Sequence, residues 1–126
     1  MSEIEIAKKT RKMAYAPYSE YQVGAVLIGK SGKMYTGCNV ENYGIQSICA
    51  ERVAFTKAIS EGEREFQKIV IVGGKKGDHL EECLPCGYCR QFMSEFVEKN
   101  FKIITWKGER EQEYSMDQLL PYGFKL

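Results

Sequence analysis

The six residues at 68–73, Lys-Ile-Val-Ile-Val-Gly, limit the possible folds of this chain more than any other segment. They are nearly all apolar, which is typical of a central strand that is covered on both faces. A sheet with such a strand at its centre carries helices above and below it. The segment therefore predicts an α/β fold in which helices pack on both faces of a sheet.

The rest of the 126-residue chain supplies the other elements. Apolar positions with helical spacing and capping residues predict helices at about 3–14, 49–60, 86–99 and directly after Ser115. Strand patterns predict further strands at 21–28, 33–38, 102–106 and 111–115. This order predicts a three-layer α/β/α fold, with a mixed five-stranded sheet and helices on both faces. The length fits one domain spanning residues 1–126.

The connecting segments add detail to this arrangement. Residues 30–32, Lys-Ser-Gly, have the composition of a hairpin turn between the first two strands. Residues 107–110 form a loop so short that the last two strands must be antiparallel. Residues 39–48 are rich in polar and turn residues and are predicted to form a loop. The helix at 86–99 has an apolar stripe made of Tyr88, Phe92, Met93 and Phe96.

The charge and the terminal sequence limit the possible partners. The chain has 18 basic and 17 acidic residues, a net charge of +1, and the two kinds lie close together along most of its length. This balance argues against a nucleic-acid partner and leaves a small substrate. No apolar run approaches the roughly 20 residues of a membrane helix. The start MSEIEIAKKT lacks the apolar core of a signal peptide, so a cytoplasmic protein is expected.

Three of the five cysteines lie close together in the sequence, at Cys83, Cys86 and Cys89. Disulfides do not persist in a reducing compartment, so metal binding or catalysis is the better interpretation of this cluster. Cys86 and Cys89 form a C-x-x-C at the start of a predicted helix, where both thiolates can reach one ion. Cys83 and Cys86 have the same spacing. The spacing alone does not choose between the two pairs, nor between a metal site and a redox pair.

A second segment, Cys-Ala-Glu-Arg at 49–52, opens another predicted helix. Three cysteine ligands with one open position are typical of a catalytic zinc site, because a structural site is closed by four ligands. The open position would hold a water that zinc makes acidic. Glu51 would then lie near the metal without binding it and could move the proton. Arg52, and also Gln91, are placed to donate hydrogen bonds to the thiolates.

The motifs together resemble the small, homotetrameric, three-cysteine cytidine deaminases. The resemblance rests on segments that follow one another in the family's order: A-Y-A-P-Y-S-E-Y-Q-V-G-A at 14–25, G-C-N-V-E-N at 37–42, C-A-E-R at 49–52, S-E-G at 60–62, P-C-G-Y-C-R-Q at 85–91 and L-L-P at 119–121. C-A-E followed about 35 residues later by P-C-x-x-C is the signature of zinc deaminases. The resemblance covers nearly the whole chain.

The resemblance implies a metal site and a catalytic residue. The family's three zinc ligands correspond to Cys49, Cys86 and Cys89, which excludes Cys83. The glutamate of C-A-E is the family's acid and base, and it corresponds to Glu51. The implied reaction is hydrolytic deamination of cytidine and 2′-deoxycytidine to uridine and 2′-deoxyuridine, with release of ammonia, in pyrimidine salvage.

The resemblance also implies the substrate site and the assembly. Asn39 and Glu41, from N-V-E, correspond to the residues that hold the ribose hydroxyls. Tyr21, at a position where phenylalanine is commoner, packs on the nucleoside, and Ala50 of C-A-E belongs to the same site. Phe124 corresponds to a C-terminal aromatic residue that reaches a neighbouring subunit's site in the homotetramer.

Other functions remain to be separated from this one. The loop at residues 43–48 is one residue shorter than the family's usual A-S-Y-G-L-T-I, which leaves the fine substrate preference open. A deaminase of a cytosine nucleoside antibiotic such as blasticidin S shares the zinc motifs but lacks the N-x-E ribose contacts that Asn39 and Glu41 supply. An inactive zinc protein that serves as a binding module is opposed by Glu51.

Overall fold

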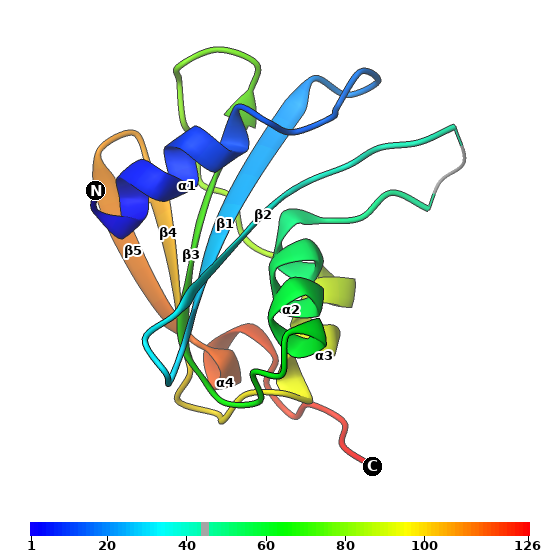
Figure 1. Ribbon diagram of the computed structural model, residues 1–126, viewed down its shortest axis with the longest axis vertical. Helices are drawn as coiled ribbons and strands as arrows, with labels where there is room; N and C mark the ends of the chain where they lie inside the picture. Colours follow the sequence, from blue (N-terminus) through cyan, green and yellow to red (C-terminus); the bar gives the residue numbers. More distant parts are fainter. Residues whose placement is uncertain (44–45) are drawn as a thin grey trace.

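The computed structural model describes residues 1–43 and 46–126, and the strands of these residues form one mixed five-stranded sheet (Figure 1). The strands are β1 (Tyr21–Gly29), β2 (Met34–Cys38), β3 (Phe66–Lys75), β4 (Lys102–Lys107) and β5 (Arg110–Ser115). They lie in the order β2-β1-β3-β4-β5. Only β3 and β4 pair in parallel among these strands. The predicted mixed sheet is confirmed, and the apolar segment at 68–73 lies in its central strand.

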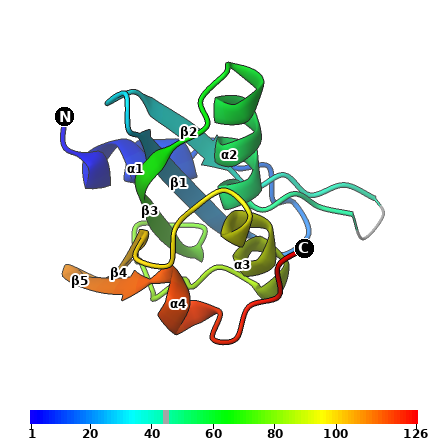
Figure 2. The same cartoon turned by 90° about the horizontal axis from the view of Figure 1, so that it is seen from below.

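Helices cover both faces of this sheet (Figures 1 and 2). The helices of the described residues are α1 (Glu3–Arg11), α2 (Ala50–Ser60), α3 (Gly87–Ser94) and α4 (Met116–Leu119). Helix α1 packs against β1 and β3 on one face, whereas α2 and α3 lie on the other face. The predicted three-layer α/β/α arrangement is therefore confirmed. None of the helices in the described part of the chain has the length and apolar character that crossing a membrane requires.

The core is divided by the sheet into two parts, as alternate residues of each strand point to opposite faces. In β1, Ala25 and Leu27 face α2, whereas Val26 and Ile28 face α1. The α2 side is the larger cluster and contains Phe55, which is fully buried. The chain thus buries apolar surface on both faces of one sheet, and α2 is packed firmly against one of them.

Two helices end earlier than the sequence predicts. Helix α1 was expected over 3–14 but ends at Arg11, because the chain then joins another segment: Tyr15 forms an isolated bridge with Val40, and its N–H donates to the Asn39 carbonyl. This pairing requires extended backbone, so the helix cannot continue. The pairing partner lies more than twenty residues away, beyond the reach of a local pattern.

Helix α3 was expected over 86–99 but ends at Ser94. Val97 and Phe101 are both buried in the cluster beneath α2. The chain must leave the helix axis to bring these two side chains into the core, and burial of large apolar side chains outweighs the weak local preference for another helical turn.

The start of α2 is held close to β2 by a glycine. A Cβ atom built on Gly37 would lie 2.4 Å from the Ala50 carbonyl oxygen and 2.6 Å from the Ala54 nitrogen. Both atoms belong to the helix backbone and cannot move aside, so this contact requires glycine. The close approach fixes the N-terminal turn of α2, which carries Cys49 and Glu51.

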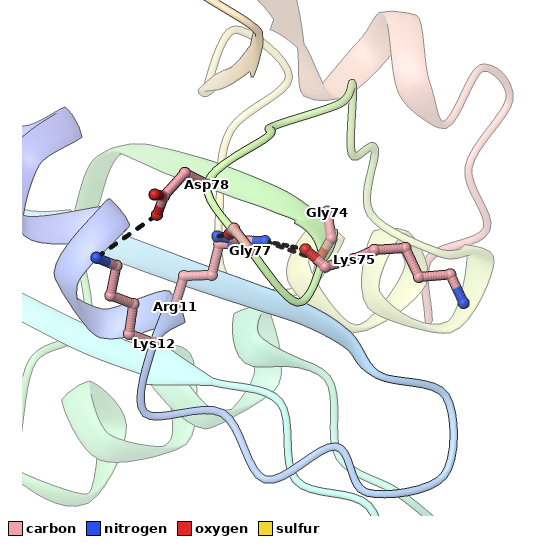
Figure 3. A network of polar contacts seen from close by, with 6 residues as sticks. All are labelled: Arg11, Lys12, Gly74, Lys75, Gly77 and Asp78. Carbon is pink, nitrogen blue, oxygen red and sulfur yellow. Dashed lines mark hydrogen bonds and ion pairs between the residues drawn. The ribbon is translucent and has the colours of Figure 1, made fainter.

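A buried arginine fixes the other side of the sheet (Figure 3). Arg11 is 2% exposed, and its guanidinium donates to the carbonyl oxygens of Gln22, Gly74, Lys75 and Gly77 at distances of 2.6–3.1 Å. These four hydrogen bonds replace the water that a buried charge loses. They join the end of α1, the start of β1 and the turn after β3, from which the chain runs on toward α3.

Candidate active site

Three thiols meet where the N-termini of α2 and α3 come together. Cys49 is the N-cap of α2, Cys86 is the N-cap of α3, and Cys89 is buried in the first turn of α3. Their sulfur atoms all lie within 4.8 Å of one another, and the sulfurs of Cys49 and Cys86 are 3.8 Å apart. Tetrahedral zinc with Zn–S bonds of about 2.3 Å places two sulfurs about 3.8 Å apart. The donor set therefore fits zinc, with one position left for a further ligand.

The surroundings favour the thiolate form of Cys49. The cluster lies at two helix N-termini, where the first N–H groups lack intrahelical acceptors and the helix dipole stabilises negative charge. A hydrogen bond from the Cys89 thiol lowers the pKa of Cys49 to about 5, and Arg52 adds to this effect, although burial acts in the opposite direction. The Cys49 thiolate in turn raises the pKa of Cys89, which donates the proton of that hydrogen bond. A thiolate is the form that binds metal.

Cys83 lies outside this cluster. Its side chain packs against the core beneath α2 and against β3, where a Cβ atom built on Gly73 would lie 2.7 Å from its sulfur. Burial raises the pKa of Cys83 to about 12, and the nearby Glu51 carboxyl adds to this shift. A thiol that keeps its proton is a packing residue. The structure thus brings Cys86 and Cys89, and not Cys83, to Cys49.

Glu51 is almost completely buried, with 3% of its surface exposed, in the first turn of α2. Burial raises its pKa to about 7, and the negative charge of Cys49 acts in the same direction, while a backbone hydrogen bond opposes them. A carboxyl group with a pKa near 7 can both accept and donate a proton at neutral pH. Its burial beside a metal-binding cluster is unusual for a structural carboxylate and is typical of a catalytic one.

Arg52 lies beside the cluster, whereas Gln91 does not contact it. The Nη2 atom of Arg52 lies 3.6 Å from the Cys49 sulfur and also donates to the Ser47 carbonyl oxygen. Burial lowers the pKa of Arg52, but the contacts with the sulfurs of Cys49 and Cys89 outweigh this effect and raise it. The Gln91 amide donates instead to the carbonyl oxygen of Phe124, at 3.1 Å, and to a serine hydroxyl. The sequence predicted that Gln91 donates to the thiolates, but in the structure its amide donates to these two other acceptors.

Asn39 and Glu41 both tie their loop to the start of β1. The Asn39 side chain accepts from the Val23 N–H at 2.8 Å and donates to the Tyr21 carbonyl oxygen at 2.9 Å. The Glu41 carboxylate accepts from the Ser19 hydroxyl and from the N–H groups of Tyr18 and Ser19. The Ser19 hydroxyl lowers the pKa of Glu41, so this residue is a carboxylate. Each of these side chains therefore already has protein partners, which sequence reasoning did not foresee.

The remaining predicted substrate residues lie on three different elements. Tyr21 begins β1, and its ring edge lies, with the Cys83 sulfur, against Gly73. Ala50 is fully buried as the first residue of α2. Phe124 is 61% exposed in the C-terminal tail, which passes beside α3 (Figure 2). The loop at 43–48, which is one residue shorter than the family's usual loop, includes residues 44–45, and these two lie outside the described residues.

Tyr88, which was predicted to belong to the apolar stripe of α3, lines one surface pocket together with Phe92 and Phe96 but is not buried. Its side chain is 65% exposed, and its ring lies against Arg52, with the guanidinium carbon 4.1 Å from the ring centroid. The sequence contained a signal for this position: Cys86 and Cys89, three residues apart, share one face of α3, so Tyr88, one of the two residues between them, points elsewhere.

Comparisons with known proteins agree with this geometry. Residues 2–105 match the family model described as the cytidine and deoxycytidylate deaminase zinc-binding region. A probable cytidine deaminase of Dictyostelium discoideum is 42% identical over 121 residues, which cover 94% of this chain and 78% of that protein. A cytidine deaminase of Sporosarcina psychrophila is 41% identical over 94% of this chain and 85% of that protein.

The solved structures give the same result. The cytidine deaminase of Burkholderia pseudomallei superimposes with a TM-score of 0.87 at 39% identity, covering 98% of this chain and all of that one. Among the relatives compared by sequence, a blasticidin-S deaminase of Bacillus cereus is less similar to this chain, at 28% identity. The fold and the three-thiol site define a zinc-binding deaminase. The chain belongs to the cytidine deaminase family.

Proposed function

We propose that this protein hydrolyses cytidine and 2′-deoxycytidine to uridine and 2′-deoxyuridine, with release of ammonia. The observation that carries this proposal is the buried Glu51 carboxyl, whose pKa is about 7, in the helical turn that begins at Cys49, one of three clustered thiols that fit zinc. The 40–42% identity to cytidine deaminases over nearly the whole chain supports the nucleoside as substrate.

Each group has a distinct role in this reaction. Cys49, Cys86 and Cys89 would hold the zinc, which when bound would supply the Lewis acidity that makes a water nucleophilic near neutral pH. Glu51 would take a proton from the attacking water and deliver it to N3 of the base, and would then take the proton of the hydroxyl added at C4 and deliver it to the departing amine, as the C4 carbonyl forms and the C4–N bond breaks. Its burial excludes bulk water from these transfers. Arg52 offsets part of the negative charge of the thiolates.

The substrate contacts follow the same proposal. Asn39 and Glu41 hold the ribose hydroxyls, and Tyr21 packs on the nucleoside. Ala50 offers a backbone N–H from the first turn of α2, where helical N–H groups lack intrahelical acceptors. Phe124, exposed at the end of a tail, reaches the site of a neighbouring subunit in a homotetramer.

The cellular role that fits this activity is pyrimidine salvage, carried out by one domain spanning residues 1–126. A reducing compartment such as the cytoplasm suits the protein, because all five cysteines are unpaired in the structure and the proposed ligands must stay reduced.

The direct test is the loss of ultraviolet absorbance when the zinc-loaded protein is mixed separately with cytidine, 2′-deoxycytidine and blasticidin S. We expect rapid turnover of both nucleosides and little turnover of the antibiotic. The antibiotic is included because of the 28% identity to a blasticidin-S deaminase and the shortened loop at 43–48. Turnover of the antibiotic alone would contradict the proposal.

The ribose contact can be tested at Glu41. A charge-assisted hydrogen bond contributes roughly 1.5–3 kcal/mol, and part of this energy positions the base for reaction. Glu41→Ala is therefore expected to lower kcat/KM for cytidine by at least about tenfold. Deamination of free cytosine, which has no ribose, should hardly change. Steady-state kinetics with both substrates measure the difference.

The structure supplies a matched control for this variant. Glu41 also accepts hydrogen bonds from the 17–20 segment, including one from the Ser19 hydroxyl. Ser19→Ala removes that internal donor and keeps the carboxylate, so it should retain most of the activity on cytidine. An equal loss for cytidine and cytosine in Glu41→Ala, shared by Ser19→Ala, would show that Glu41 supports the loop and does not bind the sugar.

A further inference from the structure

We propose that Tyr88 is a positioning residue for the metal centre: its ring holds the Arg52 guanidinium against the thiolates. This inference rests on the zinc site of the proposed function. It goes beyond the proposed function, in which Tyr88 has no role. The two side chains come from different helices, Arg52 from α2 and Tyr88 from α3.

Arg52 has few contacts that fix its orientation among the described residues. Its Nη2 atom makes two long contacts, one of 3.3 Å to the Ser47 carbonyl oxygen and one of 3.6 Å to the Cys49 sulfur, and the Cys89 sulfur also lies near the guanidinium. Its Nε atom is buried and has no hydrogen-bond partner in the described part of the chain. A guanidinium has five N–H donors and usually fixes its plane by using several of them. Hydrogen bonds alone therefore leave Arg52 weakly oriented.

The ring of Tyr88 supplies the missing contact. The guanidinium carbon of Arg52 lies 4.1 Å from the ring centroid, well within the roughly 6 Å range of a cation–π interaction. Arginine stacks well on aromatic faces because its guanidinium is planar and weakly hydrated. Tyr88 is 65% exposed, so burial in the core does not explain the position of its ring.

The place of the pair gives the contact a consequence for the metal. Three thiolates and one Zn²⁺ carry a formal charge of −1, and Arg52 is the cation that contacts the Cys49 sulfur. Tyr88 lies between Cys86 and Cys89 in the first turn of α3. The stacked pair thus connects the two helical turns that carry the three thiols, and it keeps a positive charge beside them. Loss of the ring should let Arg52 turn toward solvent and should weaken zinc binding.

The test is the rate at which zinc leaves the loaded protein and appears on a colorimetric chelator in excess. Exposed cation–π contacts are weak, so Tyr88→Leu is expected to speed zinc release by about two- to fivefold. Tyr88→Phe keeps an aromatic face and should release zinc at the wild-type rate. Tyr122→Leu is the matched control, because Tyr122 is a fully exposed tyrosine in the C-terminal tail. Circular dichroism checks that each variant is folded.

A double-mutant cycle separates positioning from a general structural effect. If Tyr88 acts through Arg52, adding Tyr88→Leu to Arg52→Gln should cause no further change in zinc release. The inference is overturned if Tyr88→Leu releases zinc at the wild-type rate, or if Tyr88→Phe releases zinc as fast as Tyr88→Leu. It is also overturned if Tyr88→Leu speeds zinc release by the same factor in the wild type and in Arg52→Gln. A wild-type protein that binds no zinc would overturn the proposed function itself, and this inference with it.

Discussion

Glu51→Gln is expected to keep the fold and the zinc but to lower kcat for cytidine by about 10²–10⁴-fold or more. A positioned proton shuttle contributes a factor of this size to one transfer, and Glu51 serves more than one in the proposed reaction. Glutamine has the same shape but cannot take up or release a proton. Because glutamine has nearly the volume of glutamate, the substitution leaves no cavity, and at a position that is 3% exposed it hardly changes the protein surface.

The measurement pairs kinetics with metal analysis. Steady-state rates with cytidine give the loss in kcat, and the zinc content of the same sample shows that the metal is retained. Glu61→Gln is the matched control, since Glu61 is an exposed glutamate at the other end of α2. Retention of more than a tenth of the activity in Glu51→Gln would remove Glu51 from its assigned role.

The sequence was sufficient to predict the parts of this molecule that local patterns determine. The apolar segment at 68–73 predicted the central strand, and the turn at 30–32 predicted the hairpin, whose Gly32 has a φ of 92°. Cys49 and Cys86 were expected at helix starts, and both are N-caps. These features depend on residues within a few positions of one another, where propensity and hydrophobic period carry most of the information.

Distant contacts determined what the sequence did not predict. The end of α3 depends on burial of Val97 and Phe101 under α2, and the roles of Asn39 and Glu41 include hydrogen bonds to residues about twenty positions earlier. The ring of Tyr88 lies against an arginine of another helix. No local pattern contains these partners, so each becomes visible only once the elements are placed in space.

The choice between Cys83 and Cys86 shows this limit most clearly, and it leads to a reciprocal prediction. Both cysteines stand three residues from a neighbouring cysteine, so spacing cannot separate them. In the structure, Cys86 is exposed and 3.8 Å from Cys49, whereas Cys83 packs against the core and Gly73. Substitution of Cys86 should therefore affect metal binding, and substitution of Cys83 should affect packing.

Cys86→Ala is expected to lose the zinc, which the wild type binds at about one ion per chain, because two thiolates cannot complete a tetrahedral site. Cys83→Ala should keep the wild-type zinc content and instead lower the free energy of unfolding by about 1 kcal/mol, since it removes a partly buried sulfur from a packed position. Metal analysis of purified protein and denaturation of the metal-free forms measure the two effects. In the metal-free forms Cys86→Ala should be nearly as stable as the wild type, because its side chain is exposed. Zinc loss in Cys83→Ala with retention in Cys86→Ala would mean that the other pair binds the metal.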